Sequence, residues 1–108
     1  MATAEELAEI KAICQAAAYV SEGEHGFVDL PALKIEVGSE TVTRHALLSL
    51  KGHSGYTSRL YLSEPIPGRG RNWTKHSVLG RQWHTPSWNN VMPGRPIEML
   101  QQHLKVYR

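Results

Sequence analysis

The residues of this chain that could do chemistry gather in one stretch, between positions 73 and 90. It holds all three tryptophans and two of the six histidines, namely Trp73, Trp83, Trp88, His76 and His84. Tryptophan is costly to expose and carries one N–H that needs a partner, so the stretch predicts either a local core or an aromatic-lined pocket. The candidate binding residues are Trp73, His76, Arg81, Trp83, His84 and Trp88.

The two histidines of this stretch allow acid–base chemistry but lack the pattern of a metal site. Imidazole transfers protons near neutral pH, and Arg71, Lys75 or Arg81 could stabilise the charge of a phosphate during cleavage. His76 and His84 would then be the proton-transfer residues of a metal-independent ribonuclease, a reaction found on small sheets with an N-terminal helix among bacterial toxins. Zinc ligands usually lie closer together and include Cys, so we expect no metal and no cofactor.

A glycine–arginine run before this stretch favours nucleic acid as an alternative partner. In Gly68-Arg69-Gly70-Arg71, two arginines on a flexible frame could enter a minor groove, and Trp73 could stack on a base. The nucleic-acid candidates are Arg69, Arg71 and Lys75. A solvated loop is the other interpretation of the same run.

Length and composition bound the kind of protein. A chain of 108 residues, 41% hydrophobic and 20% charged, predicts a single domain over residues 1–108. No apolar run approaches the roughly 20 residues of a membrane span, so we expect no membrane partner. The first ten residues carry acids and no Lys or Arg, unlike a secretory signal. Because Cys14 is the one cysteine, no internal disulfide can form, and we expect a cytoplasmic protein.

Charge divides the chain into two unlike halves. Up to residue 40, two bases stand against eight acids, a net charge of −6, and from residue 41 ten bases stand against two acids, a net charge of +8. This asymmetry predicts either an anionic partner for the second half or attraction between the halves, within the fold or between the copies of a homodimer. The shortage of carboxylates argues strongly against a paired Asp/Glu acid–base site in the second half.

The first element is predicted to be a helix from residue 3 to about residue 20. Thr3 and Glu6 have the spacing of a capping box, and apolar residues recur at helical spacing through Cys14 and Ala17. The position of Cys14 on this apolar stripe favours a buried thiol over a nucleophile.

The middle of the chain is predicted to form an antiparallel meander. Residues 33–37, 42–50 and 56–62 alternate apolar and polar side chains, with Gly-containing turns between them. A short fourth strand is expected at residues 76–79, and the rest of the Pro- and Trp-rich stretch is expected to be irregular.

The last element is predicted to be an amphipathic helix. Pro96 suits its first turn, and apolar residues at helical spacing continue to Tyr107. The order is an N-terminal helix, a three- to four-stranded antiparallel meander, an irregular Pro/Trp-rich segment and a C-terminal helix. This order predicts an α+β fold in which one sheet packs against helices.

The second half of the chain also resembles a known family. The runs HSVLGRQWHTPS at 76–87 and PGRPIEML at 93–100, followed by His103 and Leu104, resemble the C-terminal part of bacterial proteins with the ubiquitin-conjugating-enzyme (UBC) fold. Those proteins are found beside genes for ubiquitin-like and activating proteins. The resemblance covers residues 73–104 and implies a UBC-like sandwich.

The chain departs from this family at the catalytic position. A conjugating enzyme carries its thioester on a cysteine after the meander, and this sequence has no Cys beyond Cys14. Asn89 and Asn90, which could match the family's oxyanion-stabilising Asn, then have nothing to stabilise. The resemblance therefore implies a non-catalytic variant that binds a protein partner, such as a ubiquitin-like protein.

Three interpretations of function stand at this point. The first is a non-catalytic binding or adaptor module whose surface is centred on the Trp/His/Arg stretch. The second is a metal-independent ribonuclease-like or nucleic-acid-binding protein that uses the basic half. The third is an accessory protein of bacterial mobile DNA.

Overall fold

The computed structural model describes residues 3–50, 58–87 and 91–108 and has the predicted α+β class. Its N-terminal helix, α1, spans Ala4–Lys11 and begins with the predicted capping box. The Glu6 N–H donates to Thr3 Oγ1 at 3.1 Å, and the Thr3 N–H donates to Glu6 Oε1 at 2.9 Å. These two bonds satisfy backbone donors that a helix start leaves without partners.

The N-terminal helix is shorter than the sequence predicts. After Lys11 the chain turns, with the Cys14 N–H donating to a carbonyl of the last helical turn, and Ala18–Glu22 then forms strand β1. The predicted extension to residue 20 was wrong because Tyr19 and Val20, an aromatic and a β-branched residue, pair with the next strand. The predicted burial of the Cys14 thiol is confirmed, since this residue is 3% exposed.

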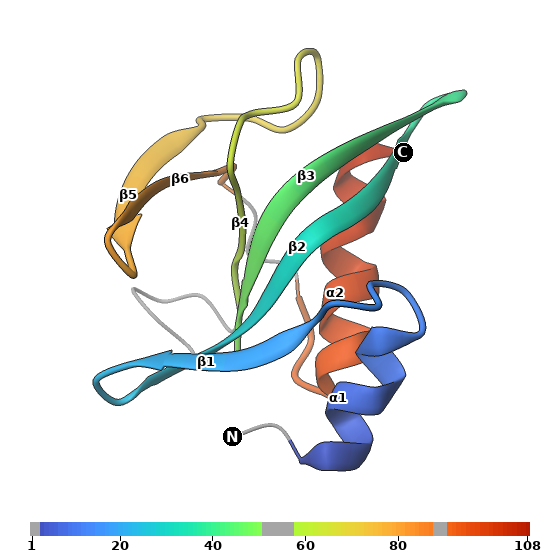
Figure 1. Ribbon diagram of the computed structural model, residues 1–108. Helices are drawn as coiled ribbons and strands as arrows, with labels where there is room; N and C mark the ends of the chain where they lie inside the picture. Colours follow the sequence, from blue (N-terminus) through green and yellow to red (C-terminus); the bar gives the residue numbers. More distant parts are fainter. Residues whose placement is uncertain (1–2, 51–57, 88–90) are drawn as a thin grey trace.

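In the described part of the chain, six antiparallel strands form one sheet in the order β1-β2-β3-β4-β6-β5 (Figure 1). After β1 come β2 His25–Val37, β3 Glu40–Ser49, β4 Leu60–Leu62, β5 Thr74–Val78 and β6 Arg81–Thr85. The predicted meander is confirmed as β2, β3 and β4, which pair in sequence order. The start of its third predicted strand, residues 56 and 57, lies outside the described residues.

Part of the stretch that was predicted to be irregular is a regular hairpin. β5 and β6 pair along their whole length. The two residues that join them, Leu79 and Gly80, have φ angles of 52° and 73°. Two successive positive φ angles belong to the tight turn that matches the twist of paired strands, and glycine adopts such an angle without steric cost. The predicted fourth strand is thus confirmed as β5, whereas β6 was missed.

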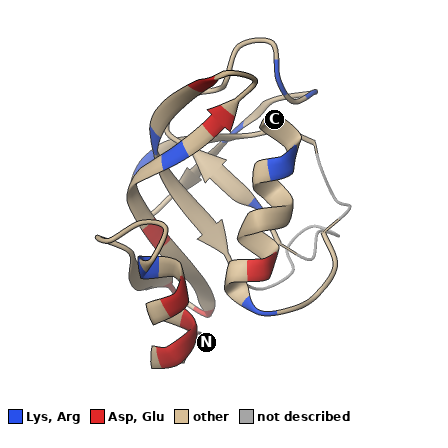
Figure 2. Ribbon diagram, turned by 90° about the vertical axis from the view of Figure 1, so that its right-hand side faces the viewer, with Lys and Arg blue, Asp and Glu red and all other residues tan. Residues whose placement is uncertain are grey.

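The two helices cover one face of the sheet (Figures 1 and 2). The predicted terminal helix is confirmed as α2, Pro96–Leu104, which continues into a 3-10 turn at Lys105–Tyr107. Within the described residues, neither helix has the length and apolar character that crossing a membrane requires. The main core lies between helices and sheet, and its largest buried members include Ile10, Val28, Leu30, Leu33, Ile35, Leu48, Leu60, Leu62, Leu100 and Tyr107.

The other face of the sheet, which we call the concave face, is curved. The β5–β6 hairpin bends round until it approaches β1 (Figure 1). The backbone N–H of Leu79 in the hairpin turn donates to Glu22 Oε2 at 2.6 Å, which ties the two edges of the sheet together. A second apolar cluster lies on this face and contains Phe27, Leu47, Tyr61, Val78 and Trp83.

Candidate functional site

Strand alternation brings three of the candidate binding residues together on the concave face. His76 lies opposite Trp83 across the β5–β6 pair, and its ring meets the Tyr61 ring edge to face, with centroids 5.6 Å apart. Arg81 lies over Trp83, its Cζ 5.1 Å from the ring centroid. Residues two apart on a strand point to the same side, so this grouping follows from the register of the hairpin.

The remaining candidates lie elsewhere. Lys75 and His84 are opposite each other on the outward side of the hairpin, one residue out of phase with the inward-facing side chains. Trp73 packs against the main core and stacks on Tyr107, with ring centroids 6.2 Å apart. Trp88 lies outside the described residues.

The two described tryptophans do not share a pocket. Trp83 is 2% exposed within the second cluster, and its Nε1–H donates to the Val78 carbonyl at 3.0 Å. The Nε1–H of Trp73 donates to the Arg69 carbonyl at 2.9 Å. The sequence left a local core and a pocket as alternatives, and these two indoles are parts of two separate cores, each with its N–H satisfied.

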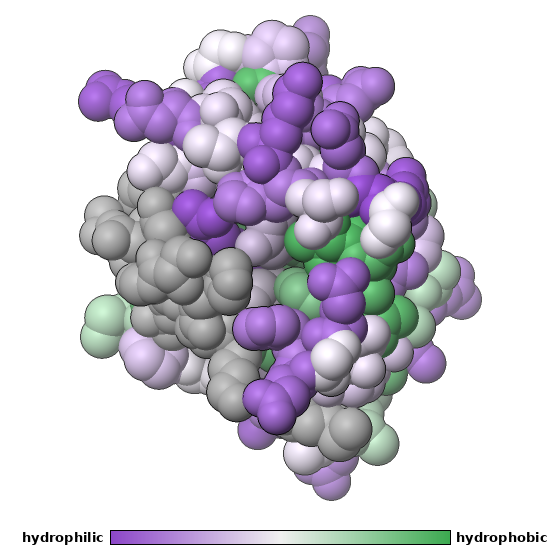
Figure 3. Space-filling model, turned by 90° about the vertical axis from the view of Figure 1, so that its left-hand side faces the viewer, coloured by the Kyte–Doolittle hydropathy of each residue, from purple (hydrophilic) through white to green (hydrophobic). Residues whose placement is uncertain are grey.

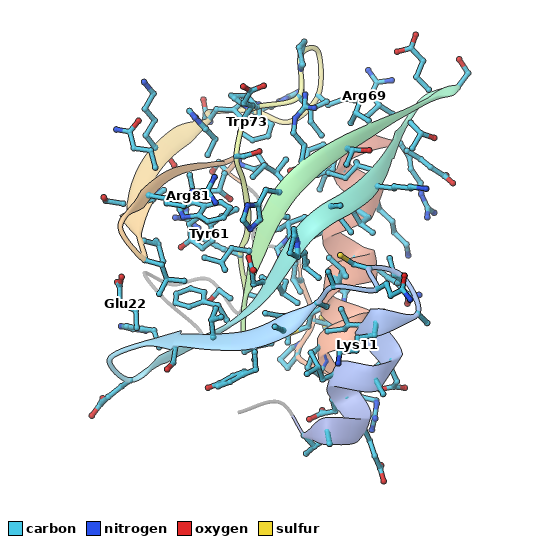
Figure 4. The ribbon with its side chains drawn as sticks, viewed as in Figure 1. Lys11, Glu22, Tyr61, Arg69, Trp73 and Arg81 are labelled. Carbon is cyan, nitrogen blue, oxygen red and sulfur yellow. The ribbon has the colours of Figure 1, made fainter. Side chains whose placement is uncertain are left out.

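The glycine–arginine loop is tied to the body of the protein. Arg69 Nε donates to the Tyr107 carbonyl at 3.1 Å. Gly70 has a φ of 75°, and a Cβ built on it would lie 2.9 Å from Pro86, so a glycine is needed for this close approach. This packing does not fit the flexible hook that the sequence suggested, and Arg71 lines a separate hollow of about 310 Å³. Figure 4 shows Arg69 beside this loop, apart from Arg81.

A chain of three polar side chains crosses the rim of the concave face. His45 of β3 has its Nε2 2.5 Å from Asp29 Oδ1 of β2, and its Nδ1 2.8 Å from Nη1 of Arg81. Because a guanidinium can only donate, we assign the lone pair to Nδ1 and the proton to Nε2, which donates to Asp29. The side chains of His45 and Asp29 are 26% and 28% exposed, so solvent and ligands can reach this chain.

A second arginine–histidine pair lies deeper in the concave face. Arg59 is 8% exposed, and its Nη1 is 3.2 Å from Nε2 of His76. Thr74 Oγ1 is 2.9 Å from the same nitrogen. By the same reasoning, Nε2 of His76 accepts from Arg59. A cavity of about 230 Å³ opens beside this pair and is lined by Glu22, His25, Phe27, Ser49, Tyr61, His76, Ser77 and Val78.

The concave face therefore combines an apolar floor, whose five members are at most 9% exposed, with a polar rim. The cavity beside His76 is where Phe27, Tyr61 and Val78 of this floor can be reached. Figure 3 shows, on this side of the molecule, an apolar area bordered by hydrophilic residues. Figure 4 shows the side chains of Tyr61 and Arg81 in the space between β6 and β3. A site of this kind can hold an apolar group and an anionic group at the same time.

Sequence reasoning missed three residues of this site: Asp29, His45 and Arg59. They come from β2, from β3 and from the segment before β4, outside the stretch of residues 73–90. The sequence carried one weak signal: the alternation of apolar and charged residues at 28–30 places Asp29 on the opposite face of its strand from Val28 and Leu30. The same alternation recurs at Lys34 and Glu36, so it does not by itself mark a site.

The described side chains offer no grouping typical of a metal centre. In residues 3–50, 58–87 and 91–108, no three His, Cys, Asp or Glu side chains lie together in a way that could hold a metal ion. Asp29, His45 and His76 are instead bound to arginines or to each other.

Comparison with known proteins identifies no relative of this chain. No protein-family model matches this chain, and no curated protein or solved structure is significantly similar to it. The fold and the site themselves define the class: an α+β domain with helices on one side of a six-stranded antiparallel sheet and a rimmed concave face on the other.

Proposed function

We propose that this protein is a binding module without catalytic chemistry, and that its concave face holds a segment of a partner protein. One observation carries the proposal: among the described residues, an apolar floor and a charged rim occur together on the sheet face that the helices leave open. Burial of apolar surface supplies affinity, and aromatic residues and arginine dominate the energetics of many protein interfaces.

The proposal includes a UBC-like fold and a ubiquitin-like partner. The order of elements supports the fold: α1, the meander β2–β4, a Pro-containing segment at residues 63–67, and α2. The choice of a ubiquitin-like protein as the partner depends on the resemblance of residues 73–104 to proteins that are found beside genes for ubiquitin-like proteins.

The position of Cys14 supports a role without thioester chemistry. A thioester forms on an accessible thiolate. Cys14 is the one cysteine of the sequence, and it lies in the main core, on the side of the sheet away from the concave face. Thioester transfer at the concave face therefore has no nucleophile in this chain.

The test compares variants on the two sides of one hairpin. Arg81→Ala and His76→Ala remove side chains from the concave face, whereas Lys75→Ala and His84→Ala remove side chains from the outward face. Binding of ubiquitin and of a bacterial ubiquitin-like protein is measured by NMR titration and calorimetry. We expect the inward variants to raise Kd about tenfold, or about 1.4 kcal/mol, and the outward variants to change it less than about twofold.

Two results would contradict the proposal. One is the absence of binding to every ubiquitin-like protein tested, with the fold intact by circular dichroism. The other is binding that the outward variants weaken as much as the inward ones, because the contact surface would then lie elsewhere.

A second candidate function, cleavage of RNA without a metal, is favoured by the pair of Asp29 and His45. An imidazole that donates one N–H to a carboxylate is arranged as a general base, and the other nitrogen of His45 would serve once Arg81, which donates to it, turns to the phosphate. It would take the 2′-hydroxyl proton, the 2′ oxygen would attack phosphorus, and His76, after taking up a proton on Nε2 and parting from Arg59, would protonate the departing 5′ oxygen. Loss of RNA cleavage in His45→Gln but not in His84→Gln would support this candidate, and an inactive wild-type protein would remove it.

A further inference from the structure

The Arg81 guanidinium is held in place with one edge open. Its plane is placed by the buried Trp83 ring, 5.1 Å from Cζ, and its Nη1 donates to Nδ1 of His45. Among the hydrogen bonds of the described residues, Arg81 uses Nη1 alone. The N–H groups of Nε and Nη2 lie on the other edge, and a carboxylate accepts from such an edge through two parallel bonds.

We propose that Arg81 binds a carboxylate side chain, Asp or Glu, within an extended segment of the partner. The inference rests on the proposed function, because it names the chemistry of the partner at the same concave face. Arg81 is exposed at the rim of that face, while the apolar floor lies beside it. A segment that crosses the face can therefore place an acidic side chain on Arg81 and an apolar side chain in the cavity that Phe27, Tyr61 and Val78 line.

The acids around Arg81 are engaged inside the chain. Asp29 accepts from His45, and Glu22 accepts from the Leu79 N–H on the far side of the face. Neither carboxylate forms an ion pair with Arg81 in the described structure. The rim therefore keeps a positive charge at this point and attracts an anionic group from outside.

The hydrogen bonds that link Asp29, His45 and Arg81 fix the orientation of the Arg81 guanidinium before the ligand binds. Ordering a free arginine side chain costs conformational entropy. The bond to His45 and the stacking on Trp83 impose part of that order in the free protein. His45 and Asp29 thus act as positioning residues, while Arg81 is the residue that contacts the ligand.

The observations favour an acidic protein segment over a nucleic acid. Nucleic acids are held through several phosphates, which need a row of exposed cations. Arg69 is bonded to the Tyr107 carbonyl, and Lys75 points to the outward side of the hairpin. Arg59, a further arginine of this face, is buried. Among these cations, Arg81 is thus the one that is exposed on the rim, and it can bind a single anionic group.

The experiment measures the binding of three short peptides and one RNA. The first peptide is N-acetylated, C-amidated Thr-Val-Leu-Glu-Val-Thr, the second has Gln in place of Glu, and the third is the Gln peptide with a free C-terminal carboxylate. A six-nucleotide RNA is the fourth probe. NMR titration follows the Nε–H of Arg81 and the indole N–H of Trp83. We expect the Glu peptide to bind at least about tenfold more tightly than the Gln peptide and to shift both signals.

Variants of Arg81 test the bidentate geometry. Arg81→Gln should abolish the preference for Glu over Gln, and Arg81→Lys should restore only part of it, because an ammonium keeps the charge without the planar pair of donors. Lys75→Gln removes a cation from the outward side of the same hairpin and should leave the preference unchanged within about twofold.

Four results would overturn the inference. They are equal binding of the Glu and Gln peptides, equal losses in Arg81→Gln and Lys75→Gln, tighter binding of the peptide with the free terminus, and tighter binding of the RNA. If a ubiquitin-like protein binds and Arg81→Gln leaves its Kd unchanged, this inference fails while the proposed function stands. If peptides show the preference and no ubiquitin-like protein binds, the carboxylate site stands while the proposed partner is wrong.

Discussion

His103 should make this protein less stable in mild acid. It is 5% exposed, and burial lowers its pKa from 6.5 to about 4. Ser58 Oγ donates to the Ser49 carbonyl at 2.8 Å and lies 3.1 Å from His103 Nε2. The serine hydroxyl therefore accepts from Nε2–H, and we assign His103 as the neutral tautomer with its proton on Nε2.

The direction and size of the effect follow from proton linkage. Between pH 6.5 and pH 4 the unfolded chain binds a proton at His103 that the folded protein does not. The unfolding free energy should therefore fall as pH falls through this window and level off below it. The pKa difference corresponds to about 3 kcal/mol at most, a large part of the stability of a small domain.

Urea unfolding followed by tryptophan fluorescence, at pH values from 7.5 to 3.5, measures this loss. His103→Gln keeps an N–H donor near Ser58 but cannot take up a proton, so its unfolding free energy should depend less on pH by about 3 kcal/mol across the window. The control is His84→Gln, which removes a partly exposed histidine and should retain the wild-type dependence. If wild type and His103→Gln lose the same free energy between pH 6.5 and pH 4, the buried neutral imidazole is not the cause.

Three further predictions concern the hairpin and its contacts. Trp83→Ala should lower the unfolding free energy by about 3 to 5 kcal/mol in urea titration, since it removes a buried indole, and a loss below about 1 kcal/mol would contradict its place in the core. Gly80→Ala should cost about 1 kcal/mol, because its φ is 73° while no other atom lies near the new Cβ; an unchanged denaturation midpoint would refute this. Glu22→Gln should speed hydrogen exchange at the Leu79 amide, and unchanged exchange would mean that the contact between the sheet edges is not maintained in solution.

Short-range patterns in the sequence were sufficient to predict several elements. The capping box at Thr3, the meander and the terminal helix each depend on residues within a few positions of one another, and all three are present. The end of α1 could not be found this way, because the strand that contains Tyr19 is stabilised by pairing with β2. Strand β6 was missed for another reason: it pairs locally with β5 across a two-residue turn, but the prolines and tryptophans around it favoured an irregular segment.

The candidate site was also predictable only where its residues lie close together in the sequence. The hairpin carries His76, Arg81 and Trp83, so a local concentration of aromatic and cationic residues pointed to part of the site. Their neighbours Asp29 and His45 come from strands that only the folded sheet brings near. Period-two alternation in β2 and β3 could have placed them on one face, but only the sheet order brings that face to the hairpin.

The charge asymmetry of the sequence has a counterpart inside the fold. Glu9 of the acidic half binds Arg95 of the basic half at 2.7 Å, where α1 packs beside α2 (Figure 2). Asp29 likewise binds His45, which accepts from Arg81. Attraction between the halves within one chain, which the sequence left as one explanation, is therefore present. These contacts account for part of the asymmetry. The charge that matters for a partner is local: the exposed Arg81 edge, which the acidic half orders through Asp29 and His45 but does not neutralise.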